Sequence, residues 1–219
     1  MDIITIETST NLKKIKPLID TWQHYGISGT ILGQGTMWSG FITKLEILKE
    51  YLNTCTHDIV LFTDSRDVVF AANHDDILNT FLSANVKILF GAETNLYPNK
   101  TLLHGDEKSK YRYLNSGMFI GYTYYLRKVF DAITLHPSID DQEALQNKYL
   151  ENYNIVLDTN CILFQNLWDE YGGRSCNFDM LYQPTYVKNA YTNTFPKIFH
   201  APGPTTVLTQ AYKVAMRLY

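Results

Sequence analysis

The chain has 219 residues, of which 45% are hydrophobic and 19% are charged, and its formal net charge at pH 7 is −3. This length suits one large α/β domain with a sizeable core. The negative charge argues against nucleic acid or an anionic membrane surface as the partner. Tyrosine and phenylalanine are abundant, with 16 and 11 residues. Exposed rings of this kind would suit a sugar or a nucleobase.

In chain order, the first half is expected to begin with a strand at residues 2–8, a helix at 12–25 and a second strand at 28–32. A glycine-rich loop at residues 33–40, a helix at 41–52 and a buried strand at 59–62 are expected to follow. The middle is expected to hold a helix at residues 74–84, a strand at 86–91 and a long apolar strand at 113–122, followed by helices at 124–133 and 143–151. The last part is expected to hold a pair of strands at residues 155–158 and 162–165, irregular β structure at 177–199 and a helix at 205–219. This alternation predicts a mostly parallel, doubly wound sheet in a single domain of residues 1–219.

The segment from Asp58 to Phe70 carries the first functional signal. Its apolar run predicts a strand that is buried on both faces and that ends in Asp64 and Asp67. Ligands of open α/β sheets bind beyond the carboxyl ends of the strands. Two acids three residues apart can share one divalent cation such as Mg²⁺ or Mn²⁺. The alternative, a turn cap at Asp64 and a solvated Asp67, stays open at this point.

Other polar side chains also stand near strand ends. Asn115 belongs to an expected Asn-Ser-Gly turn at the head of a strand, Asp140 and Asp141 precede a helix, and His200 ends a strand before a Pro/Gly turn. One of the two aspartates could equally be the helix N-cap, and a lone histidine in a turn is often structural. Two carboxylates and an imidazole can nevertheless hold a metal with positions open for phosphate oxygens. The pattern therefore favours a nucleotide-sugar site, where a metal neutralises the leaving diphosphate.

Six short runs, in this order, resemble the glycosyltransferase domain of the multifunctional procollagen lysyl hydroxylases and their relatives among collagen-modifying enzymes. The runs are Phe62-Thr-Asp-Ser-Arg-Asp-Val68, Leu89-Phe-Gly-Ala-Glu93, Tyr113-Leu-Asn-Ser-Gly-Met-Phe-Ile-Gly-Tyr122, Asp140-Asp-Gln142, Leu163-Phe-Gln165 and His200-Ala-Pro-Gly-Pro204. The resemblance implies the GT-A fold, a nucleotide-sugar-binding α/β fold. It also implies Mn²⁺-dependent transfer of a hexose from a UDP-sugar to hydroxylysine or galactosyl-hydroxylysine in collagen.

The same resemblance implies roles for individual residues. It assigns Mn²⁺ to Asp64, Asp67 and His200. It places the UDP-sugar donor against a set of cofactor-binding residues, namely Thr5, Ile6, Glu7, Trp38, Lys44, Asp64, Arg66 and Gly203. It assigns the catalytic positions, which line the donor sugar and the acceptor, to Asn115, Asp140 and Asp141, with Tyr97 where the family has a tryptophan beside the acceptor.

Two departures from the family pattern leave alternatives open. Arg66 stands where the family commonly has a tyrosine near the uracil, although a guanidinium can also stack on a base. Thr206 stands where the family has a lysine that contacts the diphosphate, so donor binding should weaken unless Lys44 or a tail residue compensates. We therefore carry two hypotheses. The chain is a hexosyltransferase that uses UDP-glucose or UDP-galactose, or it is a catalytically silent nucleotide-sugar-binding or collagen-docking module.

The remaining expectations concern location and source. The chain has three cysteines without metal-like spacing, which argues against a disulfide framework and favours a reducing compartment. No signal peptide is visible, and no apolar run reaches the roughly 18 residues that a membrane span needs. Richness in Asn, Tyr, Ile and Lys is typical of an AT-rich coding sequence and hints at a virus or microbe. We therefore expect a cytoplasmic location, in the host cytoplasm or a virus factory if the source is viral.

Overall fold

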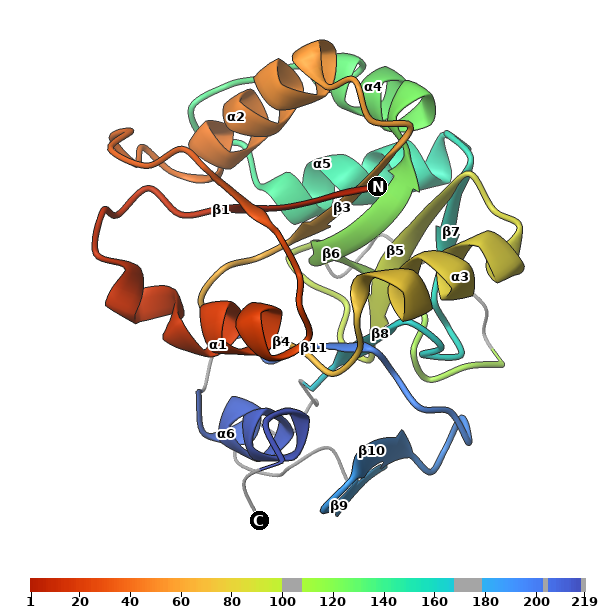
Figure 1. The fold of residues 1–219 in the computed structure, drawn as a ribbon. Coiled ribbons are helices and arrows are strands. Elements are labelled where there is room, and N and C mark those ends of the chain that lie inside the picture. Colours follow the sequence, from red (N-terminus) through yellow and green to blue (C-terminus); the bar gives the residue numbers. More distant parts are fainter. Residues whose placement is uncertain (100–107, 168–178, 203–204, 218–219) are drawn as a thin grey trace.

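A six-stranded sheet with the order β2-β1-β3-β6-β5-β7 forms the centre of the computed structural model, which describes residues 1–99, 108–167, 179–202 and 205–217 (Figure 1). Its strands are β1 (Asp2–Ile6), β2 (Thr30–Leu32), β3 (Ile59–Thr63), β5 (Ile88–Glu93), β6 (Tyr113–Tyr122) and β7 (Ile155–Leu157). Five strands run in one direction, and β6 runs antiparallel to its neighbours β3 and β5. The mostly parallel sheet is therefore confirmed, with one reversed strand that the sequence pattern does not indicate.

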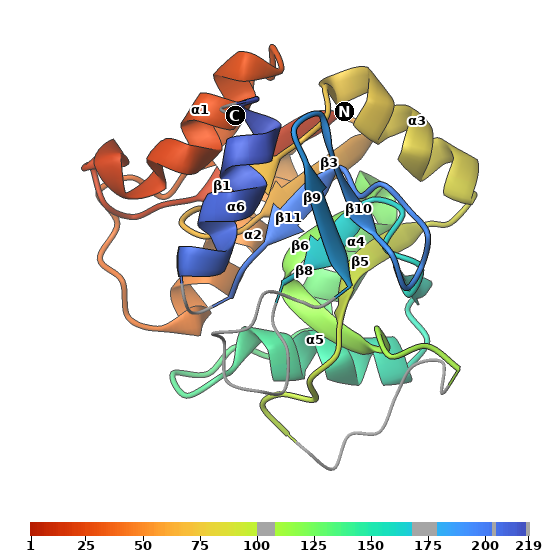
Figure 2. The same cartoon turned by 90° about the horizontal axis from the view of Figure 1, so that it is seen from below.

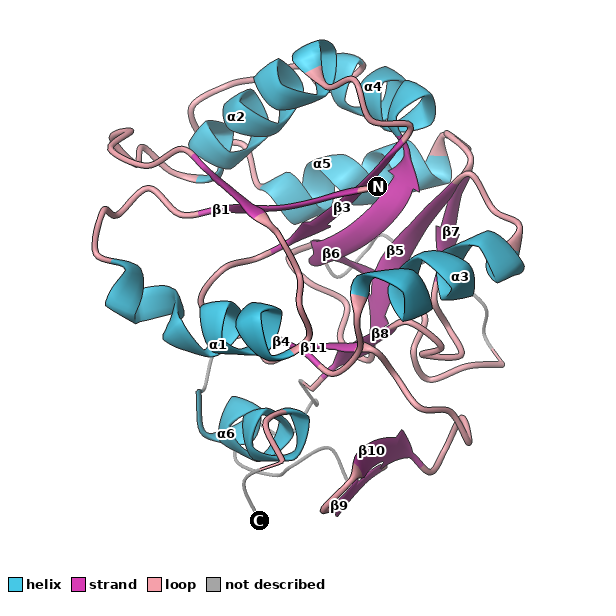
Figure 3. Cartoon of the chain, in the orientation of Figure 1, coloured by secondary structure: helices cyan, strands magenta, loops and turns pink. Residues whose placement is uncertain are grey.

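Helices cover both faces of this sheet (Figure 3). They are α1 (Lys16–His24), which follows the 3-10 turn η1 (Leu12–Ile15), α2 (Phe41–Thr54), α3 (His74–Ala84), α4 (Thr123–Asp131) and α5 (Asp141–Leu150). Successive residues of a strand point to opposite faces. Val60 and Phe62 of β3 accordingly join the apolar cluster under α2, α4 and α5, and Ile59 and Leu61 join the cluster under α1 and α3. At 14 residues α2 is the longest described helix, and none of the described helices is long and apolar enough to cross a membrane.

A smaller sheet with the order β4-β11-β8 lies below the main one in Figure 1, and Figure 2 shows it from below, next to the C-terminal helix and a β-hairpin. Its strands are β4 (Val68–Phe70), β8 (Phe164–Asn166) and β11 (Ile198–His200), and its neighbours are β9 (Met180–Gln183), β10 (Tyr186–Asn189) and α6 (Thr205–Ala215). The register sets His200 opposite Val68, and the Ala201 N–H donates to the Asp67 carbonyl oxygen at 2.8 Å. This sheet therefore brings the C-terminal part of the chain to the end of β3.

The prediction that residues 155–158 and 162–165 pair with each other is wrong. β7 joins β5 in the main sheet, whereas β8 joins β11 in the small one. The cause is the buried carboxylate of Asp158, which accepts hydrogen bonds from the N–H groups of Ile162, Leu163 and Phe164 at 2.8–2.9 Å. These bonds turn the chain out of the main sheet immediately after β7.

The expected Asn-Ser-Gly turn at the head of a strand is also wrong. Asn115, Ser116 and Gly117 lie inside β6, and the pairing of β6 with β5 shifts register between Phe90 and Gly91. An irregularity of this kind re-aims side chains without ending a strand. The three polar or small residues thus mark a local distortion within the sheet, next to the end of β3.

Candidate functional site

Asp64, Asp67 and His200 meet where β3, β4 and β11 come together. One ligand atom of each lies within 4.8 Å of the others. His200 Nε2 is 3.6 Å from Asp64 Oδ2 and 3.5 Å from Asp67 Oδ2. Two carboxylates and an imidazole in this arrangement fit a divalent cation. The structure brings together the three residues predicted to hold the metal.

Electrostatics in this cluster are dominated by burial and by close charges. Burial acts to lower the pKa of His200, but the charges of Asp67 and Asp64 outweigh it and raise the pKa. For Asp67, the charge of His200 outweighs burial and lowers the pKa of the carboxyl. Burial raises the pKa of Asp64. The raised pKa of His200 shows that negative charge dominates around its ring, and a bound cation would offset that charge.

Gly117 of β6 lies directly against His200 and Asp64. A Cβ atom at this position would lie 2.3 Å from His200 Cε1 and 2.8 Å from Asp64 Oδ2. The Gly117 carbonyl oxygen also accepts a hydrogen bond from the Asp64 N–H at 2.7 Å. Only a residue without a side chain lets the histidine and the aspartate approach the strand this closely.

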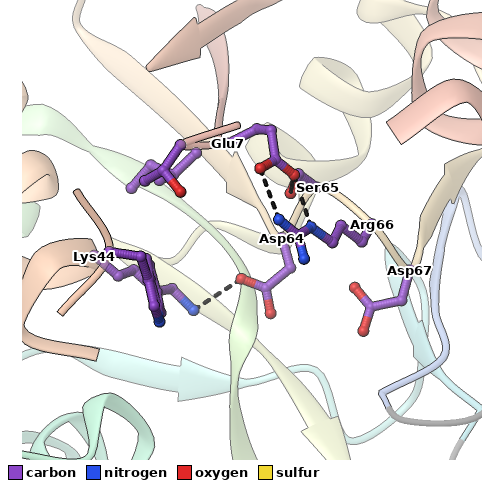
Figure 4. Close-up of a pocket in the computed structure, with 9 residues that line it drawn as sticks. Glu7, Lys44, Asp64, Ser65, Arg66 and Asp67 are labelled. Carbon is purple, nitrogen blue, oxygen red and sulfur yellow. Dashed lines mark hydrogen bonds and ion pairs between the residues drawn. The ribbon is translucent and has the colours of Figure 1, made fainter. Parts of the chain in front are cut away.

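Lys44 of α2 connects the cluster of Asp64, Asp67 and His200 to the start of α5. Its Nζ lies 2.8 Å from Asp64 Oδ1 (Figure 4) and 2.8 Å from Asp141 Oδ2. The exposed fractions of the Lys44 and Asp141 side chains are only 8% and 4%. Burial acts to lower the pKa of Lys44, but the two carboxylates outweigh it and raise the pKa. Lys44 is thus a buried cation that is already shared between two carboxylates.

The two adjacent aspartates before α5 have different environments. Asp140 is the N-cap, and its Oδ1 accepts a hydrogen bond from the Glu143 N–H at 3.0 Å. Asp141 is the first helical residue and pairs with Lys44. The alternative that one of the pair caps the helix is therefore correct for Asp140. The catalytic assignments of both residues stay predictions.

Glu7 and Arg66 form a bidentate pair at the end of β1. Arg66 Nε and Nη2 each donate to a Glu7 carboxylate oxygen at 2.8 Å (Figure 4). The same carboxylate accepts hydrogen bonds from the Ser9 N–H at 2.8 Å and the Ser65 hydroxyl at 3.4 Å. The hydrogen bonds with Arg66 lower the pKa of Glu7. Glu7 therefore ties β1 to the turn that carries Asp64 and Asp67.

A cavity of about 410 Å³ lies over this turn. The predicted donor-binding or metal-binding residues that line it are Ile6, Glu7, Trp38, Lys44, Asp64, Arg66 and Asp67. Trp38, on the loop before α2, is 49% exposed. An exposed indole and a guanidinium beside a cluster of acids are groups that suit a nucleotide with a metal-bound diphosphate.

The other predicted residues lie elsewhere or are not described. Thr5 is fully buried and donates its hydroxyl to the Thr63 carbonyl oxygen at 2.8 Å, so its hydroxyl serves strand pairing. Tyr97 is 58% exposed, and its carbonyl oxygen accepts hydrogen bonds from Gln142 and Gln146. Gly203 lies outside the described residues. Thr206 belongs to α6, but its side chain is outside what the structure describes.

Sequence reasoning misses a buried polar network beside the cluster. Glu93 Oε1 accepts hydrogen bonds from Asn115 Nδ2 at 3.2 Å and from Gln142 Nε2 at 2.8 Å. Burial raises the pKa of Glu93 to about 7. Asn115 Oδ1 and Asn166 Oδ1 both contact His200 Nδ1, at 3.1 and 2.9 Å. The one available signal is the acid that ends the otherwise apolar run of β5.

Comparisons with known proteins give a consistent result. The family profile described as PLOD GT domain matches residues 1–213. Procollagen-lysine,2-oxoglutarate 5-dioxygenase 2 of Mus musculus is 30% identical over 231 residues, which cover 94% of this chain and 30% of that protein. An uncharacterised protein of Acanthamoeba polyphaga mimivirus is 29% identical over 203 residues, which cover 85% of this chain and 42% of that protein. The chain thus spans less than half the length of these curated relatives.

A solved structure shows the same fold. The galactosyltransferase LgtC, in complex with donor and acceptor sugar analogues, superposes with a TM-score of 0.58 at 15% sequence identity. The match covers 98% of this chain and 95% of that one. This likeness confirms the predicted GT-A fold.

Proposed function

Because the chain belongs to the PLOD GT domain family, we propose that it is a Mn²⁺-dependent hexosyltransferase. It moves glucose or galactose from a UDP-sugar to a hydroxyl acceptor, which is hydroxylysine or galactosyl-hydroxylysine of a collagen-like polypeptide. The observation that carries the proposal is the cluster of Asp64, Asp67 and His200 beside a cavity of nucleotide-compatible chemistry. The proposal concerns this chain alone and not the further activities of its longer relatives.

The charges around the cluster leave room for one divalent cation. Glu7 is matched by Arg66, and Asp64 and Asp141 share the single charge of Lys44, whereas Asp67 faces His200. A histidine binds a metal as the neutral imidazole, so in the metal-binding state the formal balance of Asp64, Asp67, Asp141 and Lys44 is three negative against one positive. A divalent cation returns it to zero, and when bound it would neutralise charge on the departing UDP.

The ring of His200 supports the same fit. Its Nδ1 faces two amide oxygens, so Nε2 is the nitrogen that faces Asp64 and Asp67. Nε2 is buried and has no hydrogen-bond partner among the described residues. A buried polar atom without a partner is unfavourable unless an ion satisfies it. The donor set therefore suits a metal better than it suits the bare cluster.

The remaining residues order the donor. Lys44 holds Asp64 and Asp141 in place, so its charge is already compensated. Among the described residues that line the cavity, Arg66 is the other cation; it is paired with Glu7, but 54% of its side chain is exposed, against 8% for Lys44, so an incoming diphosphate can reach it. We therefore assign to Arg66 part of the positive charge that a lysine at position 206 would bring. Asn115 and Asp141 would orient the hydroxyls of the transferred sugar.

Transfer to defined peptides tests the proposal and separates it from the silent-module hypothesis. UDP-glucose and UDP-galactose would each be incubated, with Mn²⁺, with a hydroxylysine peptide and with a galactosyl-hydroxylysine peptide. Mass spectrometry should show the gain of one hexose on one of the peptides, and Asp67→Asn should abolish the gain. If neither donor modifies either peptide while calorimetry still detects UDP binding, the silent binding module is the correct reading.

A further inference from the structure

Asn166, the last residue of β8, is completely buried beside His200. Its Nδ2 donates to the Ala92 carbonyl oxygen at 2.9 Å, and its Oδ1 lies 2.9 Å from His200 Nδ1. A carbonyl oxygen can only accept a hydrogen bond, so the contact with Ala92 fixes which end of the amide is the NH₂ group. The end that faces the histidine is therefore the oxygen.

Asn115 leads to the same conclusion through different partners. The Gly117 N–H donates to Asn115 Oδ1 at 2.9 Å, so this atom is also an amide oxygen. It lies 3.1 Å from His200 Nδ1. Nδ1 is within hydrogen-bond distance of two acceptors, whereas Nε2 lies 3.5–3.6 Å from the carboxylate oxygens and makes no hydrogen bond among the described residues, so Nδ1 is the nitrogen that carries the hydrogen. The two amides together require the proton of the neutral ring to be on Nδ1.

The other ring nitrogen is left with a lone pair. His200 Nε2 then points this lone pair toward Asp64 and Asp67, where a cation would be bound. An acceptor on the far side of a ligating imidazole fixes the tautomer, orients the ring and makes the ligand nitrogen more basic.

We infer that Asn166 is a positioning residue for the metal site, because it holds His200 in the tautomer and orientation that present Nε2 to a cation. The parallel register of β8 and β11 sets Asn166 directly opposite His200, so the contact is built into the small sheet. Asn115 is the weaker of the two acceptors, because its contact with Nδ1 is longer, at 3.1 Å against 2.9 Å. The effect on metal affinity rests on the proposed function, whereas the tautomer is a property of the metal-free protein.

The first experiment reads the tautomer without metal. In ¹⁵N-labelled protein, at a pH where the ring is neutral, the His200 signals should show the hydrogen on Nδ1, with His200→Gln identifying those signals among the 6 histidines. Asn166→Leu should shift the ring toward a mixture of both tautomers. Asn166→Asp keeps an acceptor and should keep the wild-type tautomer. Asn166→Ala, which adds no bulk, gives the same reading as the leucine variant if the latter does not fold.

Gln165→Leu is the matched control. Gln165 is the neighbouring buried amide on β8, and its side chain bonds to the Asn166 carbonyl oxygen and to Asn189 instead of His200. This variant removes an amide of equal burial from the same strand. It should leave the His200 tautomer unchanged.

The second experiment measures Mn²⁺ affinity by calorimetry in the absence of any sugar donor. Asn166→Leu should bind Mn²⁺ roughly 10- to 100-fold more weakly than the wild type, as expected for loss of the outer partner of a ligating histidine. Asn166→Asp and Gln165→Leu should both stay close to the wild-type affinity. Wild-type tautomer and wild-type Mn²⁺ affinity in the leucine and alanine variants would overturn the inference and leave the proposed function intact. An Asn166-dependent tautomer in a protein that binds no Mn²⁺ would support the positioning role and refute the metal site.

Discussion

Replacement of Lys44 by methionine should destabilise the metal-free protein strongly. The side chain of Lys44 is nearly buried, and methionine fills a similar volume without the charge. Loss of one partner from a buried ion pair costs about 3–5 kcal/mol, because the other charge is left uncompensated. Asp141 is almost fully buried, but Asp64 is 33% exposed and water can solvate it in part. We therefore expect a loss of about 3 kcal/mol, at the lower end of that range.

The protein is unfolded without metal by urea and, separately, by heat, and unfolding is monitored by tryptophan fluorescence and circular dichroism. For a chain of this size, the expected loss corresponds to a fall in Tm of about 6–12 °C. The double variant Lys44→Met/Asp141→Asn removes the buried charge together with its partner, and it should recover about 2 kcal/mol of the loss. Lys16→Met is the control. It breaks an exposed i,i+4 pair with Asp20 and should cost less than about 0.5 kcal/mol.

Two results would refute this reasoning. The first is a Lys44→Met variant whose free energy of unfolding is within about 0.5 kcal/mol of the wild type, which is the range of ordinary surface substitutions. The second is a double variant no more stable than the single one. Either would mean that Lys44 does not neutralise Asp141 and Asp64 in the folded protein.

Three further predictions concern Gly117, Glu93 and Arg66. Gly117→Ala places a methyl group against His200, so Mn²⁺ affinity in calorimetry should fall more than about 10-fold while circular dichroism stays native; unchanged affinity would contradict the packing argument. The pKa of Glu93 is raised from 4.5 to about 7, so its stabilising contribution is complete below pH 4.5 and is lost as the pH rises through 7. In urea unfolding, the free energy of unfolding of Glu93→Gln relative to the wild type should therefore rise by about 3 kcal/mol across that pH range. Equal pH dependence of the two proteins would refute the shift. Arg66→Lys keeps the charge but cannot bond both Glu7 oxygens, so the Kd for UDP should rise roughly 3- to 10-fold, and an unchanged Kd would show that the pair does not order the cavity.

The main sheet and the position of the turn that carries Asp64 and Asp67 could be predicted because their sequence signals are local. β3 is apolar at every position because both of its faces are covered, and Asp64 follows immediately at its carboxyl end. The same type of signal locates most helices to within a few residues. The choice between Asp140 and Asp141 as the cap could not be made, because both are good N-cap residues and only the buried Lys44 distinguishes them.

The rest of the site depends on long-range pairing. β4 has only three residues, too few for a period, and its antiparallel pairing with β11 is what brings His200 beside Asp67. Apart from the family resemblance, only the position of that histidine at the end of a strand connects it to the turn that carries Asp64 and Asp67. Asn166 and Glu93 are buried by partners distant in sequence; no local pattern marks Asn166, and the only sign of Glu93 is an acid at the end of the apolar run of β5. The single-domain, cytoplasmic and viral expectations stay predictions.

The most direct test of the central claim is UDP release from UDP-glucose and UDP-galactose, with and without Mn²⁺, by the wild type and by Asp67→Asn. This variant keeps the size of the side chain and removes one of the two carboxylates that face His200. Asp58→Asn is the control, because Asp58 is exposed at the start of β3, away from the cluster. The account predicts Mn²⁺-stimulated release by the wild type and the control, and a loss of more than about 10-fold in Asp67→Asn. Full Mn²⁺-dependent release by Asp67→Asn, or release by the wild type that is indifferent to divalent metal, would contradict it.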